Sequence, residues 1–501
     1  MVKESLHELI HSMTMSEKRH FKIYASKHVI GGSNDYVQLF DAIAEQVEYN
    51  DEFLKRESFV KNLPAEKNYL YRLILRSLNS FHDSSSAKNK IYTLLKNIEI
   101  LYHKGLYDQA LRLVRKAKKL TQENELFIQE LVVNELEVEL LSKQFKYEEA
   151  SIKVRGAEET IDELRNFNLL QRVTTDCYNT RLKIGSSRSE EDTERLKKYL
   201  NEEGVGLVNY PKTKRAEMYQ LGLNLTYSYF IGDESKTLDL TEKMTNLYEQ
   251  NEFLIEYSTI GYVSSLYNLH NAYIGSSRPD DAGRTLNKLE DCRSKYGIPT
   301  SDNIGARVFF YSTNIRLANY LKADNYKTAG SLIDGFQRDV ERFTPRIGKP
   351  QLYEFYFLMS KFYFVTAEFK KALKYSNLVL NDLKFTVRAD LLSVVRLLNL
   401  LIHFELDNDF TLEYLTKNTL SYLKKSKRLF KVEDELIQFM TNHYKVNTEK
   451  ERLGDLKQLQ LQMRKYKTNQ FEGVPFSLFD FEYWATAKLE QRSVFSFQKS
   501  S

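Results

Sequence analysis

The stretch that decides the fold reads Gly105-Leu-Tyr-Asp-Gln-Ala110-Leu-Arg-Leu-Val114-Arg-Lys-Ala117-Lys-Lys-Leu120. Its apolar side chains recur every three to four residues, which places on one helix face Leu111, Val114, Ala117 and Leu120. Gly105 stands where a preceding helix would end, because glycine readily adopts a positive φ, and Tyr107 opens the next helix. The stretch therefore predicts a helix, a tight turn and a second helix. One such pair cannot bury its apolar face alone, so it requires neighbouring pairs.

The same pattern, an aromatic residue followed three positions later by a small one, returns along the chain. It recurs at Tyr147 with Ala150, Tyr326 with Ala329, and Phe369 with Ala372. Weaker units are centred on Asp192, Thr237, Ala282 and Glu413, of which Asp192 and Glu413 fit the small position poorly and are placed by register. Counted from Ala110, the successive gaps are 40, 42, 45, 45, 47, 43 and 41 residues. This regularity predicts about eight helix-turn-helix repeats with a period of about 40–47 residues.

A second signal of internal repetition is a shared pentapeptide. Ile184-Gly-Ser-Ser-Arg188 returns as Ile274-Gly-Ser-Ser-Arg278, ninety residues or two periods later. The repetition predicts that these two units share a turn.

The repeated pattern resembles the tetratricopeptide-like family of helical repeats. The resemblance rests on G-x-Y-x-x-A-L-x-x-V-x-x-A-x-x-L at Gly105 to Leu120 and on A-x-F-x-x-A-L at Ala367 to Leu373, and it covers residues 88–445. Two features depart from that family: the period exceeds about 34 residues, and the aromatic-Leu-Gly pattern of the first helix is absent. HEAT-type and armadillo-type repeats, with periods of about 40–47 residues, stay open as neighbouring alternatives.

The resemblance implies an all-α, right-handed α-solenoid in which the first helix of each pair lines a concave groove. The polar and aromatic residues that this mapping places on the groove are Arg181, Tyr227, Tyr267, Asn271, Asn314, Lys361 and Asn399. Such side chains suit an extended peptide or a partner helix, although for any single one of them packing, for the tyrosines, or exposure to solvent, for the others, is the favoured interpretation. The clamp of two lysines, an asparagine and an arginine that some relatives use is not matched, so chaperone-tail binding is not supported.

Composition indicates a soluble, intracellular protein. The chain has 501 residues, of which 42% are hydrophobic and 28% charged, and its two cysteines, Cys177 and Cys292, form no disulfide framework. No continuous apolar segment follows a basic start, which argues against a signal peptide, and Leu391 to Phe404 is too short to span a bilayer. We therefore expect a cytoplasmic protein in which Leu391 to Phe404 forms a buried repeat helix.

The net charge of +5 is concentrated at one end of the chain. Residues 411–501 contain 16 Lys and Arg against 11 Asp and Glu, which supplies the whole excess. The densest basic run, Lys424-Lys-Ser-Lys-Arg-Leu-Phe-Lys431, is followed at once by Glu433-Asp-Glu435 and is interpreted as a solvated turn. Without a wide basic face, nucleic acid is a disfavoured partner.

The two ends lie outside the repeat. Residues 1–87 read as a helical segment that either caps the first repeat or forms a separate module, and residues 446–501 read as capping helices with a tail. The aromatic residues expected to seal the end of the core are Phe476, Phe479, Phe481, Tyr483 and Trp484, the only tryptophan.

One N-terminal motif matches a metal-site pattern. His7-Glu8-Leu-Ile-His11 is an H-E-x-x-H sequence, and on a helix its two histidines would share a face that could hold zinc. A third ligand and a substrate pocket are not evident, and Thr14 replaces the glycine of the extended motif. We expect a surface helix with solvated imidazoles, no metal and no cofactor.

The sequence therefore predicts a non-catalytic scaffold that binds another protein or a peptide. A peptide-responsive regulator with a nucleic-acid-binding N-terminal module is the first alternative. A zinc hydrolase built on His7 to His11 is the remote one.

Overall fold

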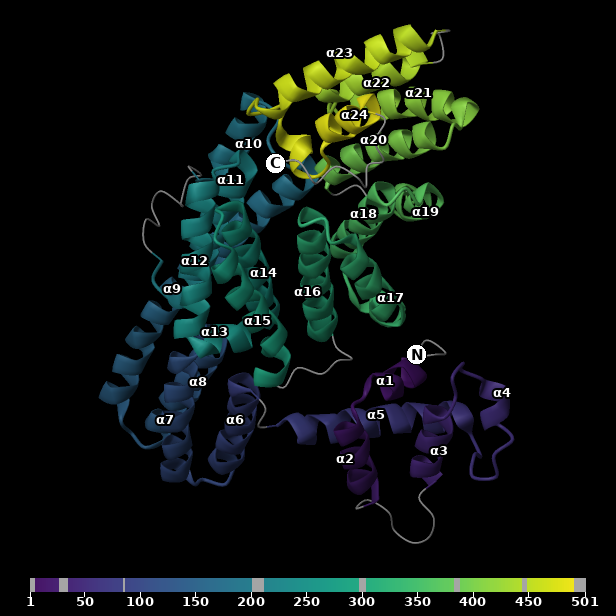
Figure 1. The fold of residues 1–501 in the computed structure, drawn as a ribbon. Helices are drawn as coiled ribbons and strands as arrows, with labels where there is room; N and C mark the ends of the chain where they lie inside the picture. Colours follow the sequence, from purple (N-terminus) through teal and green to yellow (C-terminus); the bar gives the residue numbers. More distant parts are fainter. Residues whose placement is uncertain are drawn as a thin grey trace. The chain divides into compact units, whose positions relative to one another are not determined.

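The computed structural model describes residues 5–26, 35–83, 86–200, 211–296, 303–382, 388–443 and 448–490. Within these ranges the secondary structure is entirely helical, without a strand, so the predicted all-α class is confirmed (Figure 1). No helix in the described ranges combines the length and apolar character that crossing a membrane requires.

The chain packs into two compact units. The first contains, among the described residues, 5–165 and 252–257, and the second contains 166–251, 258–296 and 303–490, each less the gaps named above. These units follow packing, and the expected segments 1–87, 88–445 and 446–501 stay a prediction.

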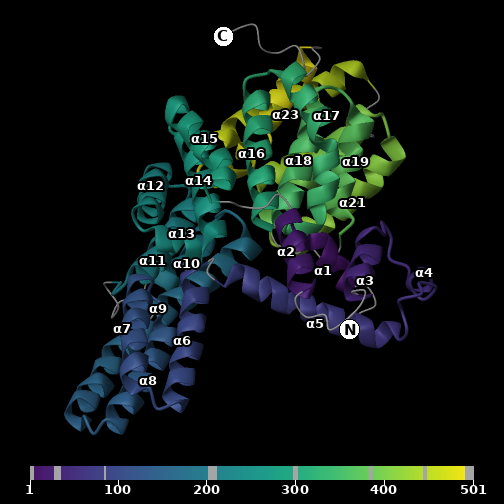
Figure 2. The same cartoon turned by 90° about the horizontal axis from the view of Figure 1, so that it is seen from below.

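The first unit holds the N-terminal helices and the first repeats. Its helices are α1 (Ser5–Ser12), α2 (Met15–Ser26), α3 (Asp35–Ala44), α4 (Asp51–Leu54), α5 (Leu63–His82), α6 (Ala87–His103), α7 (Tyr107–Glu123), α8 (Phe127–Lys143), the start of α9 (Tyr147–Ile184) and α13 (Glu252–Tyr257). Helices α1 to α5 enclose a hydrophobic cluster of their own that runs from Leu6 to Ile74, whereas α6 to α9 share another. Figures 1 and 2 show α6, α7 and α8 side by side.

The second unit holds the remaining helices. They are the end of α9, α10 (Glu190–Leu200), α11 (Lys214–Ile231), α12 (Glu234–Gln250), α14 (Thr259–Gly275), α15 (Pro279–Lys295), α16 (Asn303–Lys322), α17 (Tyr326–Phe343), η1 (Thr344–Arg346), α18 (Lys349–Val365), α19 (Phe369–Leu380), α20 (Ala389–Glu405), α21 (Asp409–Lys425), α22 (Lys431–His443), α23 (Glu449–Lys467), η2 (Val474–Ser477) and α24 (Phe481–Leu489).

Helix pairs pack in the order expected of a repeat array. The packed pairs are α6 with α7, α11 with α12, α14 with α15, α16 with α17, α18 with α19 and α20 with α21. The first helices of successive pairs also meet, because α14 packs on α16, α16 on α18 and α18 on α20. Consecutive and next-but-one contacts together are typical of stacked helical hairpins.

The turn inside each pair follows one backbone rule. Seven described hairpins contain a residue of positive φ two positions before the second helix begins: Gly105, Phe145, Gly232, Ser277, Asp324, Ala367 and Asp407. The residue after each of them donates its N–H to the carbonyl five positions earlier, at 2.8–3.1 Å, as in Leu106 to Leu101 and Glu368 to Tyr363. This left-handed C-terminal cap satisfies the last carbonyls of the first helix and reverses the chain.

The small anchor residues lie where the sequence predicts. In six of these hairpins the fourth residue of the second helix is a predicted anchor, and all six are buried: Ala110, Ala150, Thr237, Ala282, Ala329 and Ala372. Side chains of the first helices reach some of them. Ser360 Oγ donates to the Ala372 carbonyl at 2.9 Å, and His270 Nδ1 contacts the Ala282 carbonyl at the same distance.

The two anchors placed by register alone are displaced. In α21 the fourth residue is Leu412, which is fully buried, and Glu413 beside it is exposed. Asp192 is the third residue of α10. No turn separates the helix pair of Asp192 from the preceding pair, because α9 runs unbroken through 38 residues and belongs to both. The spacing therefore holds for six of the eight predicted anchors, and the sequence missed this fused helix.

The shared pentapeptide does not form one turn, and that prediction is wrong. In the first copy Gly185 has the positive φ of 81°, whereas in the second copy Gly275 ends helix α14 and Ser277 has the positive φ of 56°. A Cβ at Gly185 would lie 2.7 Å from the Asp390 Cβ, but one at Gly275 would meet nothing within 4 Å. Neighbouring structure thus decides the conformation of the first copy.

Three of the five C-terminal aromatic residues and α20 are buried as expected, and Phe476 and Tyr483 are half-buried against the same core. Phe479, Phe481 and Trp484 are at most 4% exposed and join one hydrophobic core with α20 and α22. The Trp484 indole Nε1 donates to Glu405 Oε1 at 2.8 Å. Residues Leu391 to Phe404 lie inside α20, where they form the buried helix that the sequence predicts.

Candidate functional site

Two adjoining cavities lie inside the second unit. The larger, of about 540 Å³, is lined by α11, α12, α14 and the segment after α23, with apolar contributions from Phe230, Ala272 and Phe471. We call it the apolar cavity. The smaller, of about 190 Å³, is lined by four guanidinium groups, those of Arg181, Arg188, Arg388 and Arg428. We call it the arginine pocket. The two share the lining residues Ser186, Val474 and Ser477.

Backbone contacts between distant segments position the arginine pocket. The N–H of Arg388, just before α20, donates to the Leu182 carbonyl in α9 at 2.7 Å. The N–H of Ser187 donates to the Phe230 carbonyl in α11 at 3.1 Å. Because Gly185 has no side chain, Asp390 at the start of α20 can approach the turn that follows α9.

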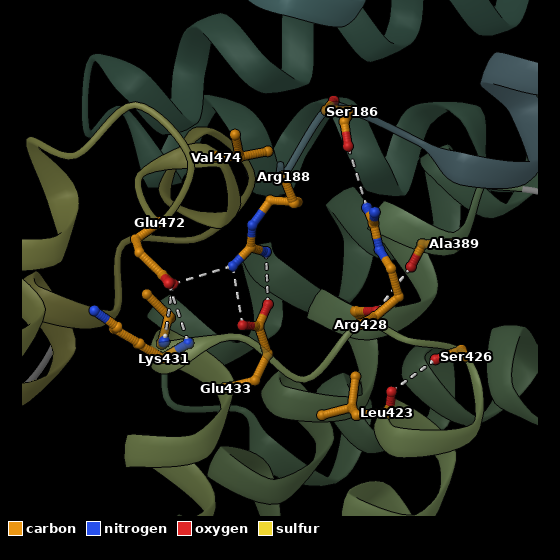
Figure 3. Close-up of polar contacts among 12 residues, drawn as sticks. Ser186, Arg188, Ala389, Leu423, Ser426, Arg428, Lys431, Glu433, Glu472 and Val474 are labelled. Atoms are coloured by element: carbon orange, nitrogen blue, oxygen red, sulfur yellow. Dashed lines mark hydrogen bonds and ion pairs between the residues drawn. The ribbon is translucent and has the colours of Figure 1, made fainter. Parts of the chain in front are cut away.

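Arg188 forms the most buried ion pair of this site (Figure 3). Its Nη1 and Nη2 donate to the two carboxylate oxygens of Glu433 at 2.7 and 3.0 Å, and the two side chains are 4% and 1% exposed. Glu472 lies 3.4 Å from Nη2 and also accepts the backbone N–H groups of Lys431 and Val432 at 3.2 Å. The carboxylate of Glu472 therefore caps the N-terminus of α22, where the helix dipole favours a negative charge.

Arg388 and Asp390 form the second pair. Arg388 Nε and Nη2 donate to the Asp390 carboxylate at 3.1 and 3.3 Å. Burial alone would lower the pKa of Arg388, but Asp390 and then Glu354 outweigh burial and raise it. Burial would likewise raise the pKa of Asp390, but Arg388 holds that pKa below its ordinary value. Both groups are therefore charged at neutral pH.

Arg428 and Arg181 lack such carboxylate hydrogen bonds. Arg428 Nη2 donates to the Ser186 carbonyl at 3.3 Å, and its Nη1 lies 3.7 Å from Asp192 Oδ2. In the described part of the chain, the Arg181 guanidinium forms no hydrogen bond or ion pair, and its Cζ lies 5.4 Å from the Tyr229 ring centre. Burial, together with a neighbouring arginine in each case, lowers the pKa of both Arg181 and Arg428.

Two of the seven predicted groove residues line these cavities, and two others contact residues beside or in the lining. Arg181 lines the arginine pocket and Asn271 lines the apolar cavity. Tyr267 donates its hydroxyl to Glu354 Oε1 at 3.0 Å, and Glu354 lies 4.0 Å from Arg388 Nη1. Burial and then Glu354 raise the Tyr267 pKa well above its ordinary value. Lys361 Nζ donates to the carbonyl of Leu478, a lining residue, at 3.1 Å, and burial lowers its pKa.

The other three predicted residues lie elsewhere. Asn399 is 4% exposed and donates to Ser376 Oγ at 2.8 Å. Asn314 is 1% exposed, and neither amide atom has a hydrogen-bond partner among the described residues. Tyr227 is half-buried against the cluster around Val173 and Leu223. Their role as partner contacts stays a prediction.

The sequence missed most of the charged residues of the site. The missed residues are Arg188, Arg388, Asp390, Arg428, Glu433 and Glu472. Arg428 belongs to the basic run interpreted as a solvated turn, but its side chain is 7% exposed. Glu433 pairs with Arg188 rather than with that run. The repeated pentapeptide was the one signal that pointed to Arg188.

The H-E-x-x-H motif lies on α1 in the first unit. The rings of His7 and His11 are adjacent, with centres 4.1 Å apart, as the helical spacing predicts. Nε2 of His7 contacts the Gln46 carbonyl at 2.8 Å, so that nitrogen acts as a donor. Among the described residues, no group of three or more His, Cys, Asp or Glu side chains is arranged to hold a metal ion.

The fold and these cavities define an all-α protein of stacked helix pairs with an internal, charge-lined site. Comparison of the chain with models of known protein families and with curated proteins found no match.

Proposed function

We propose that this protein is a non-catalytic scaffold of the tetratricopeptide-like class that binds a peptide or a segment of another protein in the apolar cavity. The observation that carries the proposal is the joined pair of cavities in the second unit. A volume of about 540 Å³ lies within the range of about 300–1,000 Å³ that is usual for ligand sites.

The lining residues come from successive first helices. Arg181 lies on α9, Tyr229 on α11 and Asn271 on α14, and these are the helices that line the concave face in the proposed right-handed solenoid. A bound segment would place apolar side chains against Phe230 and Phe471, and its polar backbone would meet groups such as the Asn271 amide. The chemistry is recognition by a preformed surface, in a protein that we expect to act in the cytoplasm.

The alternative with a nucleic-acid-binding N-terminal module has less support. Helices α1 to α5 do enclose their own core, as a separate module would. However, residues 1–87 contain 11 Lys and Arg against 12 Asp and Glu, so they offer no net positive charge to a phosphate backbone.

The test uses a synthetic pool of random eight-residue peptides passed over the immobilised full-length protein. We expect the wild type to retain a defined subset, identified by mass spectrometry, and Ala272→Trp to retain less because the indole fills the apolar cavity. Ala323→Trp adds the same bulk at an exposed position of the same unit and serves as the control. Equal retention by all three proteins would refute the proposed site.

A further inference from the structure

We propose that the arginine pocket binds a phosphate group, held by Arg181 and Arg428. The proposal deepens the proposed function, on which its peptide arm rests, by naming the chemistry recognised at one end of the site. The source of the group is either free inorganic phosphate or a phosphorylated side chain of the bound segment.

The charge of the lining is the first step. Four guanidinium groups but only two carboxylates, Asp390 and Glu433, line the arginine pocket. Each carboxylate is hydrogen-bonded to one arginine, Asp390 to Arg388 and Glu433 to Arg188. In the described structure, Arg181 then has no hydrogen bond or ion pair to a carboxylate, and Arg428 has only the 3.7 Å ion pair with Asp192, so both guanidinium groups keep N–H donors that a phosphate group could use.

Three further carboxylates lie beside the lining, and each of them also accepts a hydrogen bond from an uncharged donor. Asp192 accepts the backbone N–H of Arg188 at 3.2 Å and forms only the 3.7 Å ion pair with Arg428. Glu472 accepts two N–H groups at the start of α22 and lies 3.4 Å from Arg188 Nη2. Glu354 accepts the hydroxyl of Tyr267 at 3.0 Å and lies 4.0 Å from Arg388. None of the three lines the pocket.

An unused donor is the second, independent observation. Nε of Arg188 is buried and has no hydrogen-bond partner among the described residues, although the side chain is only 4% exposed. A buried donor without an acceptor is destabilising, and a phosphate oxygen would provide one. Guanidinium groups match phosphate geometry through paired N–H donors, and a phosphate offers several acceptor oxygens to the neighbouring arginines.

The shared lining explains how a phosphorylated segment could reach this pocket. Ser186, Val474 and Ser477 border both cavities, so a segment in the apolar cavity can extend one side chain into the arginine pocket. The four guanidinium groups would then select a phosphorylated residue at that position.

The first arm titrates inorganic phosphate into the full-length protein by isothermal titration calorimetry, with sodium chloride of equal ionic strength as the reference. We expect binding at one site and a Kd at least about tenfold weaker in Arg181→Gln, since a charge-assisted hydrogen bond is lost. Arg181→Lys keeps the positive charge but loses the paired N–H donors of the guanidinium group, so its Kd should fall between those of the wild type and Arg181→Gln. Arg278→Gln, which alters the matching arginine of the second pentapeptide, should bind like the wild type.

The second arm compares two peptide pools that differ only in serine or phosphoserine at one position. Phosphate binding that Arg181→Gln weakens identifies a free-phosphate site, and enrichment of phosphoserine peptides by the wild type but not by Arg181→Gln identifies a phosphorylated segment. If the wild type shows neither response, or if Arg181→Gln and Arg181→Lys leave both unchanged, the inference is overturned. Equal retention of both pools, together with no phosphate binding in the first arm, would keep the proposed function and reject the phosphate site. Phosphate binding without retention of either pool would reject the proposed function and keep the phosphate site.

Discussion

Replacing Glu433 by glutamine should destabilise the second unit strongly, because it leaves the buried Arg188 charge without its main partner. The two side chains are 1% and 4% exposed and are joined by hydrogen bonds of 2.7 and 3.0 Å. For charge centres about 4 Å apart in an effective dielectric of about 20, the lost attraction is about 4 kcal/mol. Glu472 remains 3.4 Å from Arg188 and preserves part of it, so we expect a loss of about 3 kcal/mol.

The only tryptophan of the chain makes this loss measurable. Trp484 is fully buried in the second unit, so its fluorescence follows the unfolding of that unit in urea. A loss of about 3 kcal/mol with a slope of about 3 kcal/mol per molar urea lowers the midpoint by about 1 M. The exposed control Glu413→Gln, which breaks a surface pair with Lys417, should leave the midpoint unchanged.

A double variant separates the loss of a partner from the intrinsic value of the pair. Arg188→Met combined with Glu433→Leu removes both charges, so the midpoint should recover most of the loss. The reasoning would be refuted if Glu433→Gln unfolded at the same urea concentration as Glu413→Gln.

Three further outcomes are expected. Burial lowers the pKa of His270 from its ordinary value of 6.5, so the contribution of His270 to stability is complete above pH 6.5 and falls as the pH decreases through the folded-state pKa. The melting temperature of His270→Gln should therefore depend less on pH between 7.5 and 5.5 than that of the wild type. The same pH dependence in both proteins would contradict this. Gly185→Ala should lower the melting temperature because its Cβ would lie 2.7 Å from that of Asp390, whereas Gly275→Ala should not, and the same response from both would be inconsistent with the structure. Ala372→Arg should lower the free energy of unfolding by several kcal/mol, and with it the urea midpoint, because a charged side chain is forced into a fully buried helix seam. An unchanged midpoint would show that Ala372 does not lie in such a seam.

The fold was largely predictable because its pattern is local. A helix, a residue that tolerates positive φ and a small anchor residue all lie within about fifteen residues, so Gly105 and Ala110 indicate a hairpin without any knowledge of long-range contacts. The prediction failed where long-range packing decides the conformation. Gly185 and Gly275 have the same sequence neighbours but differ in backbone conformation, because only Gly185 lies against Asp390.

The site was less predictable for the same reason. Arg188 and Glu433 are 245 residues apart, and nothing local to either one indicates that the other is its partner. Basic residues such as Arg428 are usually solvated, so a charged run predicts an exposed turn until the structure shows the acidic and carbonyl groups that surround it. Arg181 was predicted because the repeat pattern, which is local, places it on the first helix of a pair, and it does line the arginine pocket.

The left-handed residue in each hairpin has a consequence for how this chain can change in length. In each hairpin the buried anchor residue lies five positions after the residue of positive φ, so its position is set by that turn and not by where the previous helix began. An insertion at the far end of a second helix would consequently be absorbed in one loop rather than shifted onto every later contact. A protein built in this way can vary unit by unit over evolutionary time, which accords with spacings that range from 40 to 47 residues within a single chain.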